Sequence, residues 1–365
     1  MAQHDGEQEE KEQVHGKKES KSGFDANEVI FGHVLDAHEY HFLSYKGNDG
    51  KEHHATIPLP VILYSPQRGM DVFMSSNFHH GHDPYKGYKL DNGKIHPVKN
   101  DGSIDESVKV YDFSLTRNVV QMLLALTIFV FIMLGVAKKY KSGIGRTTAP
   151  TGLQNAIETV IVFMREDVAK PNLGHKYQKY MPYLLTVFFF ILINNIFGLI
   201  PGSANVTGNI AFTLVLGVIS FLVIIFSSNK HFWGHIFNPP GVPGFVKPIL
   251  VLVEFLGVFI KPFALIIRLF ANMVAGHIII ICLISLIFIF GQLSPAVGWG
   301  ASPVAVAFTI FIYMIEILVA FLQAYIFTTL TAVFIGLAQE EPHHGDDHKH
   351  QPELSTAKYD DPVIV

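Results

Sequence analysis

Two apolar stretches near the C-terminal end are too long for helices that cross a membrane perpendicularly. Residues 248–290 and 303–337 are mostly apolar. The 43 residues from 248 to 290 would extend about 64 Å as one helix, roughly twice the thickness of membrane hydrocarbon. Each stretch is therefore either a tight hairpin or one strongly tilted helix. Neither has a cluster of turn residues at its middle, so we predict two long tilted helices.

Three shorter apolar runs precede these stretches, at residues 118–137, 183–200 and 209–227. Each is close to the ~20 residues that a helix needs to cross hydrocarbon. Residues 151–170 differ, because apolar residues recur there at helical spacing with Glu158 and Arg165 between them. This pattern is typical of an amphipathic helix on the membrane surface. The prediction is an all-α polytopic membrane protein with about five membrane-embedded segments and one amphipathic surface helix.

The chain before the first span is polar and rich in turn residues. Residues 1–30 have almost nothing to bury, which predicts a disordered lead-in. Short apolar runs separated by turns such as Asp91-Asn92-Gly93 follow, and they predict a small β-rich domain over residues 31–115. The membrane domain is then 116–338, and the polar tail 339–365 is predicted to be disordered.

Positive charges set the expected orientation. Lys138, Lys139, Lys141 and Arg146 follow the first span directly, and such clusters mark the cytoplasmic side. We therefore expect the β-rich domain in the periplasm and the C-terminus in the cytoplasm of a bacterium, with the spans in its inner membrane. Two routes for the N-terminal domain remain open: the first span carries it across, or a signal peptide has been removed.

Five ionisable residues lie within the last two apolar stretches. They are Glu254, Lys261, Arg268, His277 and Glu316. An ionisable group at bilayer depth costs free energy and indicates function, although snorkelling or a structural ion pair would also explain Lys261 and Glu254. Arg268 lies near the centre of its segment, with no acidic residue within two turns. A carboxylate on another helix or another chain should therefore face it.

Helical spacing groups the polar residues by face. Arg268 and Asn272 are four residues apart and share a face, as do Glu316 and Gln323 on the last segment. His277 points elsewhere on its helix and is free to meet Glu316.

Depth along the helix adds a second pattern. Glu254 lies about 21 Å before Arg268 along the helix axis, and His277 about 13 Å after it. Groups that can carry a proton thus lie on both sides of a fixed cation, which suits two half-channels separated by a positive charge.

Several other classes of protein fit the sequence poorly. The single Cys282 excludes a disulfide framework, and no GxxxxGK[ST] loop is present to bind a nucleotide. The histidine cluster His79, His80 and His82 favours a solvated loop over a metal site, so neither metal nor cofactor is predicted. The net charge is −4, and the sequence has no run of basic residues that would bind nucleic acid. An independent transporter would usually show inverted repeats with broken helices, and this sequence shows none at matching positions in two halves. A purely structural scaffold would not need five ionisable residues in its last two apolar stretches.

Residues 268–277 read RLFANMVAGH, and residues 316–327 read EILVAFLQAYIF. Together with Asn194-Asn195 and the turn PGSANVTGN, they resemble subunit a of F-type ATP synthases over residues 115–338, in a long bacterial form with an extra N-terminal domain. The resemblance implies a stator beside a ring of c subunits, a subunit b stalk, other ATP synthase subunits and the lipid bilayer as partners. It also implies that the nucleotide chemistry belongs to other chains.

The resemblance further implies roles for individual residues. Arg268 would be the essential charge that faces the ring carboxylate. The proton path would include His277, Glu316, Glu254, Asn272, Gln323 and Asn195. Some family members have an acid where this chain has Gly198, so outer polar groups must come from Asn195, Asn209 or the Glu316–His277 pair. The choice between proton and sodium depends mostly on the ring, and the role of the N-terminal domain does not follow from the sequence.

Overall fold

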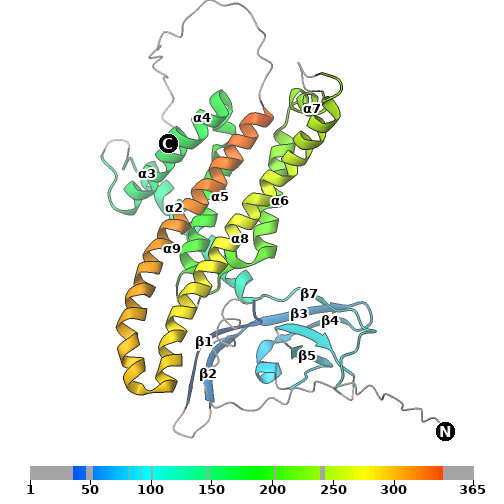
Figure 1. Ribbon diagram of the computed structural model, residues 1–365, viewed down its shortest axis with the longest axis vertical. Helices are drawn as coiled ribbons and strands as arrows, with labels where there is room; N and C mark the ends of the chain where they lie inside the picture. Colours follow the sequence, from blue (N-terminus) through cyan, green and yellow to red (C-terminus); the bar gives the residue numbers. More distant parts are fainter. Residues whose placement is uncertain are drawn as a thin grey trace, which may run out of the picture.

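The protein consists of a β-rich part and a group of long helices, with the strands gathered at one end of the helices (Figure 1). The computed structural model describes residues 36–46, 52–81, 83–91, 93–99, 102–145, 148–200, 203–238 and 243–339. The predicted disordered lead-in and residues 340–365 of the predicted tail lie outside these ranges.

The β-rich part contains three small antiparallel sheets in the described residues. The strands β1 (Glu39–Lys46) and β2 (Glu52–Pro58) form one hairpin, and β5 (Tyr88–Asp91) and β6 (Lys94–Pro97) form another. The strand β3 (Pro60–Ser65) pairs with both β4 (Gly69–Met74) and the short β7 (Tyr111–Asp112). The Asx-Gly turn predicted from the sequence is the β5–β6 turn, where Gly93 has a φ of 78°.

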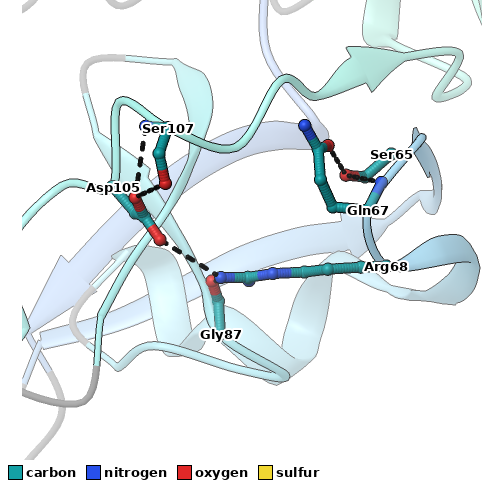
Figure 2. Close-up of polar contacts among 6 residues, drawn as sticks. All are labelled: Ser65, Gln67, Arg68, Gly87, Asp105 and Ser107. Atoms are coloured by element: carbon teal, nitrogen blue, oxygen red, sulfur yellow. Dashed lines mark hydrogen bonds and ion pairs between the residues drawn. The ribbon is translucent and has the colours of Figure 1, made fainter.

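A small apolar core and a few polar contacts hold these sheets together. Alternate side chains of β3 point inward, and the buried core consists of Val61, Leu63, Phe73, Phe78, Tyr88 and Ile95. Figure 2 shows Arg68, at the β3–β4 turn, donating to the Gly87 carbonyl oxygen at 2.8 Å and approaching Asp105 at 3.9 Å. These contacts join the β3–β4 hairpin to the segments on either side of β5 and β6.

The predicted histidine loop is mainly a 3₁₀ helix, η1 (Ser75–Gly81). The exposed His79 forms an ion pair with Asp83 at 3.2 Å, and His82 lies outside the described residues. Within the described ranges no group of three or more His, Cys, Asp or Glu side chains is arranged to hold a metal ion.

Five helical runs in the described residues are long and apolar enough to cross a membrane. Four are single helices: α2 (Arg117–Lys141), α6 (Ile210–Ser227), α8 (Lys247–Leu293) and α9 (Pro295–Ala338). The fifth run, 153–198, ends in α5 (Tyr177–Gly198). The predicted polytopic all-α architecture with a small β domain is therefore confirmed.

The helices α8 and α9 are continuous over 47 and 44 residues, as predicted, and they form an antiparallel pair (Figure 1). Ser294 is the single residue between the two helices. Its hydroxyl oxygen caps the N-terminus of α9 by accepting a hydrogen bond from the Val297 amide at 3.2 Å. α9 begins eight residues before the predicted start at Pro303, because Pro295 occupies its first turn. Helices of about 66–70 Å exceed the hydrocarbon thickness, so they must cross it obliquely or extend beyond it.

The predicted amphipathic helix is bent rather than uniform. It consists of α3 (Leu153–Phe163), a π-helical turn η2 (Met164–Ala169) and α4 (Lys170–Leu173). Met164, Val168 and Ala169 are buried, whereas Glu166 and Asp167 are exposed. Gly174, with a φ of 53°, begins the short η3 (Gly174–Lys176), after which the chain continues into α5.

The predicted loop 228–248 contains a short helix, α7 (Lys230–Phe237), that the sequence analysis did not identify. The Trp233 indole N–H donates to the Ser228 hydroxyl oxygen at 2.8 Å and so fixes the start of α7. The aromatic rings of Trp233, Phe237 and Phe255 then connect α7 to α8.

The helical core lies around α5, between α2 and α9. Its fully buried members include Phe188, Ile191, Leu269 and Phe327. The C-terminal end of α9 is fixed by polar contacts as well. The Asn229 amide donates to the Ala338 carbonyl oxygen at 2.8 Å, and the Asn229 side chain donates to the Gln339 carbonyl oxygen at 3.0 Å.

Gly336 allows α9 to pack directly on the backbone of α4. A Cβ at this position would lie 2.1 Å from the Asn172 carbonyl oxygen. Gly336→Ala should therefore destabilise the protein by about 1–3 kcal/mol, the usual cost of overpacking. The measurement is the thermal unfolding midpoint of the detergent-solubilised protein. Gly135→Ala is the control, since a Cβ at Gly135 meets nothing within 4 Å, and equal midpoints for both variants would contradict this account.

Candidate functional site between α8 and α9

The polar residues predicted from the sequence meet where α8 and α9 run side by side. α8 carries Arg268, Asn272 and His277, and α9 carries Glu316 and Gln323. Because the two helices are antiparallel, moving along α8 from Asn272 to Gly276 corresponds to moving back along α9 from Gln323 to Glu316. The faces predicted from helical spacing therefore meet in register.

Asn272 and Gln323 form a direct link between the helices. The Asn272 side-chain nitrogen donates to Gln323 Oε1 at 3.1 Å. Asn272 is exposed and Gln323 is 2% exposed, so the bond connects an open face of α8 to the interior. Gln323 Nε2 is buried and makes no hydrogen bond within the described residues.

Glu316 lies against the backbone of α8 at a glycine. A Cβ at Gly276 would be 1.9 Å from Glu316 Oε1, so only glycine leaves room for this carboxylate. Glu316 is 7% exposed, and its Oε2 has no hydrogen-bond partner in the described part of the chain. His277 is the next residue after Gly276 on α8. The structure thus places the carboxylate beside the backbone that carries the predicted partner histidine.

Arg268 occupies an exposed face of α8. Glu254, Lys261 and Arg268 are spaced by seven residues, so they lie on roughly one face of the helix, and all three are exposed. Lys261 lies over the Phe334 ring at 5.4 Å, a cation–π contact with α9. Among the described residues Arg268 forms no ion pair. No described residue therefore supplies the expected acidic partner.

Small side chains surround Arg268 on this face. Ala264, Ala271 and Ala275 are all exposed and lie within two turns of it. Small residues let another transmembrane helix approach closely, because little side-chain volume separates the backbones. The open face of α8 is thus shaped for contact with a neighbouring helix.

Two asparagines of α5 close the interior side of the site. The Asn195 side chain donates to the Ala320 carbonyl oxygen of α9 at 3.1 Å, midway between Glu316 and Gln323. The Asn194 side chain donates to the Phe190 carbonyl oxygen at 2.8 Å. Both residues are fully buried, and the Oδ1 atoms of both make no hydrogen bond within the described residues.

Asn205 is a polar residue of the site that the sequence analysis missed. It lies in the connection between α5 and α6, where its side chain caps the 3₁₀ turn η4 (Val206–Gly208) by accepting from the Gly208 amide at 2.9 Å. Its side-chain nitrogen donates to the Met273 carbonyl oxygen of α8 at 3.0 Å. A Cβ at Gly198 would lie 3.4 Å from Asn205 Oδ1. The amide of Asn205 therefore lies against Gly198.

The same connection explains the place of Asn209. Its side chain accepts from the Ala211 amide at 2.9 Å and so caps α6. Nearby, Thr207 Oγ1 is buried and has no hydrogen bond within the described residues. The turn PGSANVTGN carried the only sequence signal for Asn205, and that signal did not show which of its asparagines faces α8.

Several buried polar side-chain atoms of α5, η4 and α9 have no hydrogen-bond partner within the described residues. In the described residues they belong to Asn194, Asn195, Thr207, Glu316 and Gln323. Buried polar groups are normally hydrogen-bonded to protein or to ordered water. Such atoms, among them a carboxylate oxygen, are sites where ordered water would bind. Glu254 lies near the opposite end of α8, about 21 Å from Arg268 along the helix axis.

Comparison with known proteins gives the family. The model of the family described as ATP synthase A chain matches residues 119–336. A second family model, described as a domain of unknown function, matches residues 29–113. The chain is 50% identical over 248 residues to ATP synthase subunit a of Chloroherpeton thalassium, which covers 66% of this chain and 72% of the relative.

Two further relatives agree. Over 266 residues the chain is 44% identical to ATP synthase subunit a 2 of Chlorobaculum tepidum, covering 70% of this chain and 71% of the relative. Over 245 residues it is 46% identical to ATP synthase subunit a of Chlorobium phaeobacteroides, covering 66% and 70%. The chain therefore belongs to the ATP synthase A chain family, the subunit a of F-type ATP synthases, and is a multi-pass membrane subunit of the proton-translocating sector.

Proposed function

We propose that this chain is the stator wall along which protons cross the membrane in two half-channels separated by Arg268. The observation that carries the proposal is the exposed Arg268, which forms no ion pair among the described residues although it lies in the middle of an apolar 47-residue helix. A guanidinium in hydrocarbon costs at least about 3 kcal/mol unless a counter-charge faces it. A carboxylate on each subunit of a c-ring would supply that charge.

The outer half-channel would end at Glu316. Its carboxylate is buried against Gly276, and Asn195, Thr207 and Gln323 each have a buried polar atom with no hydrogen bond within the described residues. A proton entering from the periplasm would pass these groups, with His277 as the second group able to hold it. Asn195 would orient the path through its bond to α9.

Arg268 would separate the two half-channels. Arginine keeps its proton at all physiological pH values, so it cannot relay protons straight through. It favours the charged form of the ring carboxylate that faces it, and that carboxylate must gain a proton before it can rotate into lipid. Asn272, fixed by Gln323, would lie beside Arg268 on the ring-facing side. Glu254 would receive the released proton on the inner side.

The proposal includes the partners and the orientation of the chain. The c-ring, a subunit b stalk and the nucleotide-binding subunits would be its partners, since the sequence carries no phosphate-binding loop. The β-rich domain would lie in the periplasm and the C-terminus in the cytoplasm, because Lys138, Lys139 and Lys141 end α2. The membrane would be the bacterial inner membrane.

Arg268→Ala should abolish ATP-driven proton pumping. Loss of the counter-charge leaves a ring carboxylate unpaired in hydrocarbon, and a penalty of about 3 kcal/mol corresponds to a loss on the order of 100-fold. The measurement is acidification of inverted membrane vesicles that contain the assembled complex. Arg268→Lys should restore pumping only in part, because a buried lysine can lose its proton.

Lys261→Ala is the matched control for Arg268→Ala. It removes a cation from the same face of α8, one that already has an aromatic partner in Phe334, and it should leave pumping near the wild-type rate. Normal pumping by an assembled Arg268→Ala complex would remove the central residue of the proposal.

Gly276→Ala should lower pumping by about tenfold. The added methyl group overlaps Glu316 Oε1, and such overpacking costs about 1–3 kcal/mol. Glu316→Asp in the same chain should restore part of the rate, because the shorter side chain withdraws from the methyl group. Gly291→Ala, on the same helix with nothing within 4 Å of the added Cβ, is the control. A Gly276→Ala complex that pumps as well as Gly291→Ala would show that the Glu316 position does not limit transport.

A further inference from the structure

The β-rich domain is bonded to the outer end of the membrane helices by the residues just before and within β1. The Arg117 amide donates to the Ala37 carbonyl oxygen at 2.9 Å, and the Asn118 amide donates to Asp36 Oδ1 at 3.2 Å. Both amides belong to the first turn of α2, whose amides have no partner within the helix. Residues 36–37 therefore cap α2.

A second contact holds the same segment to the rest of the β-rich domain. His38 is 5% exposed, and its Nε2 lies 2.7 Å from Asp112 Oδ2 on β7. Figure 1 shows β1 and β7 on the side of the domain that faces the helices. The segment that caps α2 is thus also tied to the sheet.

Tyr40 extends this attachment to a different part of the membrane domain. Its hydroxyl donates to Gln121 Oε1 of α2 at 2.7 Å and accepts from the Ala204 amide at 3.3 Å. Gln121 is 6% exposed, and Ala204 is fully buried. Ala204 lies in the connection between α5 and α6, 164 residues away from Tyr40. One phenol therefore bridges α2 and the outer connection.

The residue after Ala204 reaches the candidate site. Asn205 donates to the Met273 carbonyl oxygen, three residues before the Gly276 that accommodates Glu316. Gly208 and Gly198 both border the Asn205 amide closely, so this side chain has little room to move. A continuous series of contacts thus runs from Tyr40 through Ala204 and Asn205 to the part of α8 beside Glu316.

We propose that Tyr40 is a positioning residue for the outer half-channel, and that the β-rich domain acts through it to hold Asn205 against α8. The inference rests on the proposed function, because it assigns the connection 203–208 to the wall of the outer path. Tyr40 acts on the position of the connection and does not carry the proton. Burial raises the pKa of the Tyr40 phenol above its usual value, so it stays neutral at physiological pH.

The test compares variants in inverted vesicles that contain the assembled complex, with passive proton conductance measured after the catalytic head is removed. Tyr40→Phe removes the bridging hydroxyl and keeps the ring. Conductance per assembled complex should fall about three- to tenfold, as expected for the loss of one or two hydrogen bonds. The factor should be the same from pH 6 to pH 8. Tyr64→Phe, on an exposed tyrosine of β3, is the control and should conduct like wild type.

A double variant tests the route through Asn205. If Tyr40 acts through this residue, Tyr40→Phe should cause little further loss in an Asn205→Ala background. Hydrogen exchange gives a second measurement that does not need the Asn205 variant. Peptides covering residues 203–208 should exchange faster in Tyr40→Phe than in Tyr64→Phe, because the Ala204 amide loses its acceptor.

Each other outcome overturns a defined step. Wild-type conductance by Tyr40→Phe, or unchanged exchange at 203–208, would remove the positioning role. Fully additive losses would break the link to Asn205, and a loss that changes with pH would mean that the phenol takes part in proton transfer. Arg268→Ala in the same vesicles separates the two proposals: if it conducts and pumps normally, the proposed function itself fails.

Discussion

A permanent cation in the middle of an apolar helix is the constraint on which the rest of this structure depends. Arg268 cannot lose its proton, and α8 offers it no acidic neighbour within two turns. The chain leaves Arg268 on an open face and surrounds it with alanines. In the proposed function a carboxylate of the c-ring brings the counter-charge to the same depth. The open face and the small side chains of α8 would then both serve contact with that partner.

Glycine positions determine where polar groups can lie in the interior of the helical part. Gly276 admits the Glu316 carboxylate, and Gly198 borders the Asn205 amide. At Gly276 the absence of a Cβ lets a carboxylate oxygen lie directly against the neighbouring helix. Such close contacts hold polar groups rigidly in an apolar medium, where an unpaired group is costly. The position of the Glu316 carboxylate is thus set by close packing on the backbone of α8.

The sequence was sufficient for whatever depends on local periodicity and length. Helical spacing put Arg268 with Asn272 and Glu316 with Gln323, and the structure joins those faces through the Asn272–Gln323 bond. It could not give the register between α8 and α9, because the contact of Glu316 with Gly276 joins residues 40 positions apart. The start of α9 was misplaced because Pro303 has the character of a first-turn proline, yet it lies inside the helix.

Asn205 shows the limit most clearly. It lies among other small polar residues of a turn, and only tertiary packing distinguishes the asparagine that reaches α8 from the one that caps α6. The short α7 was missed for a related reason, since its eight residues are too few for a periodic signal to stand out. Roles that depend on contacts between distant segments therefore had to wait for the structure.

The connection between α5 and α6, residues 203–208, gives a reason why the β-rich domain would matter to the candidate site between the helices. Segments between helices are usually mobile, and one that contains Ser203, Asn205 and Gly208 has little apolar surface to fix it. A proton path needs its polar groups held at hydrogen-bond distance, so the connection needs an external support. Tyr40 supplies one hydrogen bond to the connection and one to α2, from a domain that itself caps α2. If Tyr40 has the proposed positioning role, the rigidity of the proposed outer path depends on the stability of the β-rich fold, although none of its described strands enters the helical core.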